Sequence, residues 1–154
     1  MLKYTDTQVT FSEIPDEITL CINISGCQNN CDGCHSPQLR KDIGEPLYLE
    51  TLYELIDKNE GITCIVFMGG DSEPEYINIL AKCIKDLYDI KIGWYSGKQQ
   101  LSSKIDLQYF DFVKLGPYIK ERGPLNYRTT NQALFKVVHQ DSNRLTDITY
   151  KFWK

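Results

Sequence analysis

Features that direct a chain into a membrane, onto nucleic acid or out of the cell are scarce in this sequence. No apolar run approaches the roughly 20 residues that span a bilayer, and residues 1–6 lack the apolar core of a signal peptide. The 17 Lys and Arg residues are outnumbered by 21 Asp and Glu residues, and no basic run or arginine stripe occurs. We therefore expect a cytoplasmic protein with no membrane segment and no nucleic-acid partner.

The sequence also lacks internal repeats, linkers and low-complexity segments. Its 154 residues are a typical length for one domain, and a hydrophobic content of 42% is enough for an ordinary core. We predict a single domain over residues 1–154. Of the six cysteines, Cys21, Cys64 and Cys83 lie in apolar strand-like or helix-like runs, and we interpret them as small buried hydrophobic residues.

The other three cysteines, Cys27, Cys31 and Cys34, lie close together and are separated by three and then two residues. Three thiolates on one short loop can converge on a single point, which favours a soft metal or an iron–sulfur cluster. No fourth cysteine follows at a matching spacing. Three ligands on a four-iron cluster leave one iron open, and an open metal position is where chemistry can occur.

Two simpler interpretations of this loop stay open. A structural zinc site could use the same three cysteines together with His35, although the adjacent Cys34 and His35 make a poor tetrahedral pair. A disulfide is the second alternative, but it leaves one of the three cysteines over, and nothing else in the sequence indicates secretion.

Hydrophobic periodicity predicts strands that alternate with helices. We expect strands at residues 8–11, 17–24, 62–68, 91–95, 110–115 and 133–139, with a further strand possible at 147–153. We expect helices at 48–59 and 74–88, the second capped by Ser72, and a weak helix at 99–104. Such alternation implies a mostly parallel sheet. Because a closed eight-fold barrel typically needs about 250 residues, we predict an α/β fold, a partial open (β/α) barrel with a mostly parallel curved sheet.

Short polar or glycine-rich segments follow each of the predicted central strands. Because the carboxyl ends of parallel strands meet at one edge, these segments should form one ligand site: the cysteine loop, Gly69-Gly70-Asp71, Ser96-Gly97 and Gly116-Pro117. Ordinary turns are the alternative for Gly69-Gly70-Asp71 and for Ser96-Gly97, since glycine and aspartate are common turn residues. Asp71 could accept a hydrogen bond from a ligand ammonium group or cap the following helix.

The order of these motifs resembles the radical S-adenosylmethionine superfamily, in which three cysteines follow a first strand and a glycine pair follows a second. Within that superfamily the chain is similar to the activating proteins of the anaerobic ribonucleoside-triphosphate reductase. The segments that carry this similarity are Ser25-Gly26-Cys27, Asp32-Gly33-Cys34-His35, Gly69-Gly70-Asp71 and Thr130-Asn131-Gln132.

The resemblance implies that Cys27, Cys31 and Cys34 hold a 4Fe–4S cluster, whose open iron binds S-adenosylmethionine. It implies reductive cleavage of that cofactor and formation of a glycyl radical on the partner reductase, with a small electron-donor protein such as flavodoxin as a further partner. The residues expected to contact S-adenosylmethionine are Gly33, Cys34, His35, Gly69, Gly70, Asp71 and Ser96. No side chain is assigned a catalytic role, and the roles of His35, Asn131 and Gln132 are left open.

Two other functions compete with this one. The chain could be a small zinc-binding or cluster-binding adaptor without catalysis, or a radical S-adenosylmethionine enzyme that acts on another substrate.

Overall fold

The computed structural model describes residues 2–25, 43–140 and 142–153. The described elements, in chain order, are β1 (Lys3–Thr10), β2 (Thr19–Ile24), β3 (Glu45–Pro46), α1 (Leu49–Lys58), β4 (Cys64–Met68), α2 (Pro74–Leu87), β5 (Lys91–Tyr95), the 3-10 helix η2 (Leu107–Tyr109), β6 (Phe112–Leu115), β7 (Ala133–Val138), β8 (Arg144–Asp147) and the 3-10 helix η3 (Thr149–Phe152). Neither α-helix in this part of the chain is long and apolar enough to cross a membrane.

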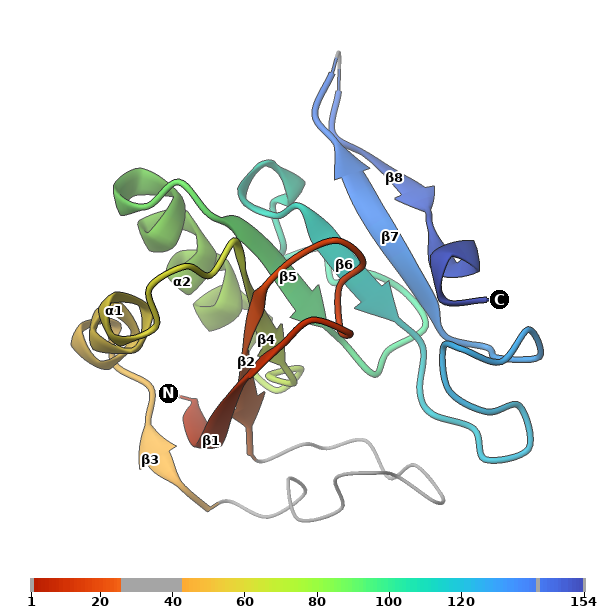
Figure 1. The fold of residues 1–154 in the computed structure, drawn as a ribbon, viewed down its shortest axis with the longest axis horizontal. Coiled ribbons are helices and arrows are strands. Elements are labelled where there is room, and N and C mark those ends of the chain that lie inside the picture. The colour runs from red at the N-terminus through yellow and green to blue at the C-terminus, as the bar shows by residue number, and fades with distance from the viewer. Residues whose placement is uncertain (1, 26–42, 141, 154) are drawn as a thin grey trace.

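The eight strands form one mixed sheet in the order β3-β1-β2-β4-β5-β6-β7-β8 (Figure 1). The neighbours in the central group β2-β4-β5-β6 are parallel. All other neighbouring pairs are antiparallel: β3 with β1, β1 with β2, β6 with β7 and β7 with β8. Antiparallel pairings therefore outnumber parallel ones, and two α-helices are found in the described residues. The predicted partial (β/α) barrel with a mostly parallel sheet is wrong.

The reason for this error lies in the connections. A helix of a dozen or so residues carries the chain back for another parallel strand, and in the described residues α1 and α2 lie in such connections. Between β6 and β7 the chain returns through a long loop instead, and β7 runs antiparallel to β6. The short turn between β7 and β8 then forms a hairpin. Hydrophobic runs of the same kind form strands in either direction, so periodicity alone did not distinguish them.

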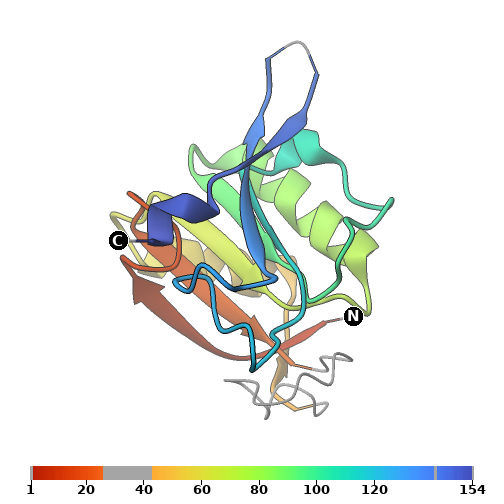
Figure 2. The same ribbon diagram turned by 90° about the vertical axis from the view of Figure 1, so that its right-hand side faces the viewer.

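Both helices pack on one face of the sheet, as the two views show (Figures 1 and 2). The apolar stripe of α2 contacts inward side chains of the central strands, among them Phe67 and Trp94, which are almost wholly buried. The stripe consists of Ile77, Leu80, Ala81 and Ile84. Burial at roughly 25 cal/mol per Å² of apolar surface makes this face the main source of stability.

A smaller core covers the opposite face of the sheet. Cys64 and Val66 of β4 pack there with Ile14, from the loop between β1 and β2, and Ile148, from the C-terminal segment. Strand β4 is therefore buried on both faces, as its continuous apolar sequence predicted.

Several predicted elements need correction. Residues 99–104 form a bend and a turn rather than a helix, and most of the segment predicted as a final strand at 147–153 instead forms η3. Strand β1 begins at Lys3, well before the short strand predicted at 8–11, because its pairing with β2 rather than its mixed polar sequence stabilises it. The residue before α2 is Glu73, so the cap predicted at Ser72 is wrong, while Pro74 does open the helix.

Candidate cofactor-binding site

The carboxyl ends of the four parallel strands lie at one edge of the sheet, and a turn follows each strand there. These turns begin at Ser25 after β2, Gly69 after β4, Ser96 after β5 and Gly116 after β6. We call this set of segments the strand-end edge. It is where ligands bind in parallel α/β arrangements, and it contains every predicted site residue that the structure describes.

Ser25 ties together the two ends of the segment that carries the three-cysteine motif. Its amide donates to the carbonyl oxygen of Lys3 at 3.0 Å, and its side-chain oxygen hydrogen-bonds to the carbonyl of Ile43. The intervening residues, 26–42, lie outside the described part of the chain. The ligand predictions for Cys27, Cys31 and Cys34 and the cofactor contacts predicted for Gly33, Cys34 and His35 fall in that segment and stay predictions.

Gly69 and Gly70 turn the chain away from β4 in a conformation that favours glycine. Their φ angles are +113° and +94°, in the left-handed region. A Cβ atom on Gly69 would lie 3.1 Å from the carbonyl oxygen of Ile24, and one on Gly70 would lie 2.8 Å from Cδ1 of Ile77. The backbone conformation therefore favours glycine at both positions, and Gly69 lies directly beside the end of β2. Cofactor contact at either glycine stays a prediction.

Asp71 joins the turn after β4 to the turn after β5. Its Oδ1 accepts from the hydroxyl of Ser96 at 2.5 Å, and its Oδ2 accepts from the amide of Gly97 at 2.9 Å. It does not cap the next helix, because α2 begins at Pro74 after Glu73. The two predicted site residues Asp71 and Ser96 are thus in direct contact, although they lie 25 positions apart in the sequence.

The turn after β6 is held by residues whose roles the sequence left open. Asn131 Nδ2 donates to the carbonyl of Pro117 at 2.9 Å, and Gln132 Nε2 lies 3.4 Å from the carbonyl oxygen of Gly116. Gly116 itself has a φ of +108°. Asn131 and Gln132 therefore anchor the backbone of the strand-end edge.

Two further residues of this edge were missed by sequence reasoning. Trp94 Nε1 donates to the carbonyl of Gly69 at 2.7 Å, which fixes the glycine turn to β5. The ammonium group of Lys114 lies 4.3 Å from the centre of the Tyr95 ring, in a cation–π contact. Both residues lie in apolar strand sequences and carry no local motif, so only the register of β5 and β6 relates them to the site.

Two of the cysteines that the structure describes, Cys21 and Cys64, are poor metal ligands. Metal binding needs the thiolate, yet burial raises the pKa of Cys21 to about 11 and raises the pKa of Cys64 still further. Cys83 is half-buried on α2. Among the described residues no group of three or more His, Cys, Asp or Glu side chains could hold a metal ion.

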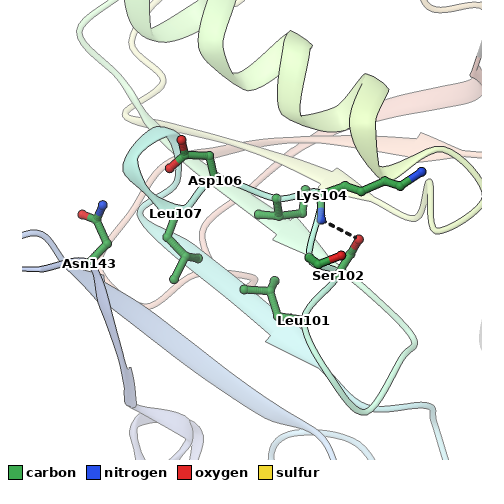
Figure 3. Close-up of a pocket in the computed structure, with 8 residues that line it drawn as sticks. Leu101, Ser102, Lys104, Asp106, Leu107 and Asn143 are labelled. Carbon is green, nitrogen blue, oxygen red and sulfur yellow. Dashed lines mark hydrogen bonds between the residues drawn. The ribbon is translucent and has the colours of Figure 1, made fainter.

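A cavity of about 610 Å³ lies elsewhere (Figure 3). It is formed by residues 101–107, between β5 and β6, together with Asn143 beside β8. It is open, and it contains none of the predicted site residues. Its apolar members, Leu101, Ile105 and Leu107, belong to the core under the helices. We therefore do not associate it with the strand-end edge.

Comparison with known proteins gives one positive result. The family described as a 4Fe-4S single cluster domain matches residues 18–135, which begin just before β2, include the whole three-cysteine segment and end within β7. No curated protein and no solved structure matches the chain. Since the match extends over more than half of its length, this chain belongs to the 4Fe-4S single cluster domain family.

Proposed function

We propose that Cys27, Cys31 and Cys34 bind the 4Fe–4S cluster and that the protein is a radical S-adenosylmethionine enzyme. In this proposal it is the activase that generates a glycyl radical on an anaerobic ribonucleoside-triphosphate reductase, with a small electron-donor protein such as flavodoxin supplying the electron. The single observation that carries the proposal is that the two ends of the cysteine segment, Ser25 and Ile43, are bonded together at the end of β2, where Gly69 lies against Ile24.

In this proposal the 4Fe–4S cluster would supply the electron. A reduced 4Fe–4S cluster is a low-potential electron donor, and its potential depends on hydrogen bonds to its sulfur atoms and on its exposure to solvent. The protein supplies binding, orientation and exclusion of competing reactions. Four hydrogen-bonded turns at the strand-end edge provide a rigid backbone surface for a ligand next to the cluster segment.

Residues at the ends of β5 and β6 are buried, which supports a firmly packed strand-end edge. Tyr95, at the end of β5, is 4% exposed and donates to the carbonyl of Glu13 at 2.6 Å. Burial raises the pKa of its phenol well above the ordinary value, so this group keeps its proton. Leu115 and Ser96 are also buried at this edge.

The ligand assignment is tested by anaerobic reconstitution with iron and sulfide. The wild-type protein should become brown and contain iron and sulfide in equal amounts, whereas Cys31→Ala should retain neither. Cys83→Ala is the matched control, because Cys83 lies on α2 away from the strand-end edge, and it should keep the full cluster. A colourless wild-type protein with one tightly bound zinc ion would contradict the proposal and favour an adaptor.

The reaction is tested with the reconstituted protein, a chemical reductant and S-adenosylmethionine. Methionine and 5′-deoxyadenosine should appear in equal amounts, measured by liquid chromatography, and Cys31→Ala should form neither. Co-expression with an anaerobic reductase should then give the electron paramagnetic resonance signal of a glycyl radical. Cofactor cleavage without that signal would favour a radical S-adenosylmethionine enzyme with another substrate.

A further inference from the structure

A chain of hydrogen bonds links three turns of the strand-end edge, and Asp71 is where it starts. The Asp71 carboxylate accepts from two groups of the β5 turn, the Ser96 hydroxyl at 2.5 Å and the Gly97 amide at 2.9 Å. Bonds to an ionised acceptor are stronger than bonds between neutral groups. This pair of contacts therefore holds the turn after β5 against the turn after β4, beyond the strand ladder that ends at Met68 and Tyr95.

The Ser96 hydroxyl bonds to groups within the turns and is not presented to a ligand. A serine hydroxyl has one proton, which is donated to Asp71, and its oxygen accepts from the Lys98 amide at 3.1 Å. The residue is 3% exposed. Its side chain consequently shapes the turn from inside and cannot donate to a ligand while the contact with Asp71 is made.

A backbone hydrogen bond connects the turn after β5 to the turn after β6. The carbonyl of Lys98 accepts from the Gly116 amide at 2.7 Å. Gly116 in turn lies against Asn131 and Gln132, which precede β7 and hydrogen-bond to the turn after β6. The position of the β6 turn therefore depends on the β5 turn, which Asp71 holds.

We propose that Asp71 is a positioning residue, which aligns the turns after β5 and β6 with the glycine turn of β4 so that they form one ligand-binding surface. The ligand class, S-adenosylmethionine, rests on the proposed function. Asp71 acts on it through Ser96 and Gly97. The competing role is a direct contact between the Asp71 carboxylate and the ammonium group of the ligand.

The alignment itself is measured without any ligand, by amide hydrogen exchange. In Asp71→Asn the side chain has one acceptor oxygen instead of two, so it cannot accept from both the Ser96 hydroxyl and the Gly97 amide through separate oxygens as Asp71 does. Loss of one such bond should raise the exchange rate of the Gly97 and Gly116 amides about tenfold. Asp106→Asn is the matched control, since Asp106 also accepts from a backbone amide, that of Gln108, but lies outside the strand-end edge. An unchanged rate at Gly116 in Asp71→Asn would overturn the proposal.

The effect on ligand binding is measured by equilibrium dialysis of reconstituted protein with two probes. S-adenosylmethionine carries the ammonium group, and 5′-methylthioadenosine lacks it. A positioning role predicts that Asp71→Asn and Ser96→Ala each weaken both probes about tenfold, and that the double variant is no weaker than Asp71→Asn alone. Weakening of S-adenosylmethionine only, with Ser96→Ala unchanged, would show a direct contact and refute the positioning role.

The two experiments keep this proposal separate from the proposed function. If the wild-type protein binds neither probe, the assignment of S-adenosylmethionine fails, while hydrogen exchange at Gly116 still decides whether Asp71 aligns the turns. If the wild-type protein binds and cleaves S-adenosylmethionine but the exchange rate of the Gly116 amide is unchanged in Asp71→Asn, the function stands and the positioning role fails.

Discussion

Replacing Gly116 by alanine tests whether the strand-end edge is as tightly packed as the structure indicates. Gly116 has a φ of +108°, and a Cβ atom there would lie 2.9 Å from the carbonyl oxygen of Asn131 and 3.1 Å from the Cα of Gln132. Both neighbours are backbone atoms, so no rotation of a side chain can relieve the contact.

Gly61 is a matched control for this substitution. Its φ of +89° places it in the same left-handed region, but no atom lies within 4 Å of a Cβ built on it. Alanine at either position meets a conformational penalty of roughly 1–2 kcal/mol. Gly116→Ala adds overpacking, typically about 1–3 kcal/mol. We therefore expect losses in the free energy of unfolding of about 1–2 kcal/mol for Gly61→Ala and about 2–5 kcal/mol for Gly116→Ala.

Urea unfolding followed by tryptophan fluorescence measures both losses, with cluster content held the same in every variant. The denaturation midpoints should differ while the slopes stay similar. Equal losses for the two variants would show that Gly116 is not confined by the 131–132 backbone. The hydrogen-bonded account of the strand-end edge would then be refuted at its β6 turn.

Two further predictions concern other parts of the structure. Burial raises the Cys21 pKa from 9.0 to about 11, so between these pH values the folded protein binds more protons than the unfolded chain. The free energy of unfolding should therefore fall as the pH rises from about 9 to about 11, by at most about 1.4 kcal/mol per pH unit for this group. Urea titrations across that range should show a shallower fall for Cys21→Ala, and an identical fall would contradict this assignment. Asp111 Oδ2 accepts from Lys85 Nζ at 2.6 Å and from the Ile92 amide at 2.9 Å in a half-buried site, so Asp111→Asn should lower the free energy of unfolding by about 1–2 kcal/mol. Glu75→Gln, which removes an exposed pair with Lys104, should lower it far less, and similar losses in the two variants would argue against a special role for Asp111.

The strands and helices were predictable where local pattern and burial agree. Strand β5 was predicted at its observed bounds, Lys91–Tyr95, and α2 was predicted within one residue of its end at Leu87. The prediction failed where a segment depends on its partners. Strand β1 carries three threonines and an aspartate among its eight residues and is a strand because β2 pairs with it.

Some features of the site could likewise be predicted from the sequence, and others could not. The order of Gly69-Gly70-Asp71 and Ser96 after successive strands was enough to predict that they share an edge, and the structure confirms that Asp71 and Ser96 touch. The same order did not indicate that Gly70 packs against Ile77, or that the Ser96 hydroxyl is used internally. Those contacts depend on the distances between separate strands and helices, which a short sequence motif does not specify.

By itself, the sequence determined which runs are apolar on both sides and that the chain belongs to the 4Fe-4S single cluster domain family, and it predicted three cysteine ligands. These properties follow from side-chain chemistry and spacing along the chain. Only the tertiary structure decided the direction of the outer strands and which turns are bonded to which. Strand direction and turn contacts are set by hydrogen-bond pairing between segments distant in sequence, and an apolar run of a given length satisfies either direction equally well.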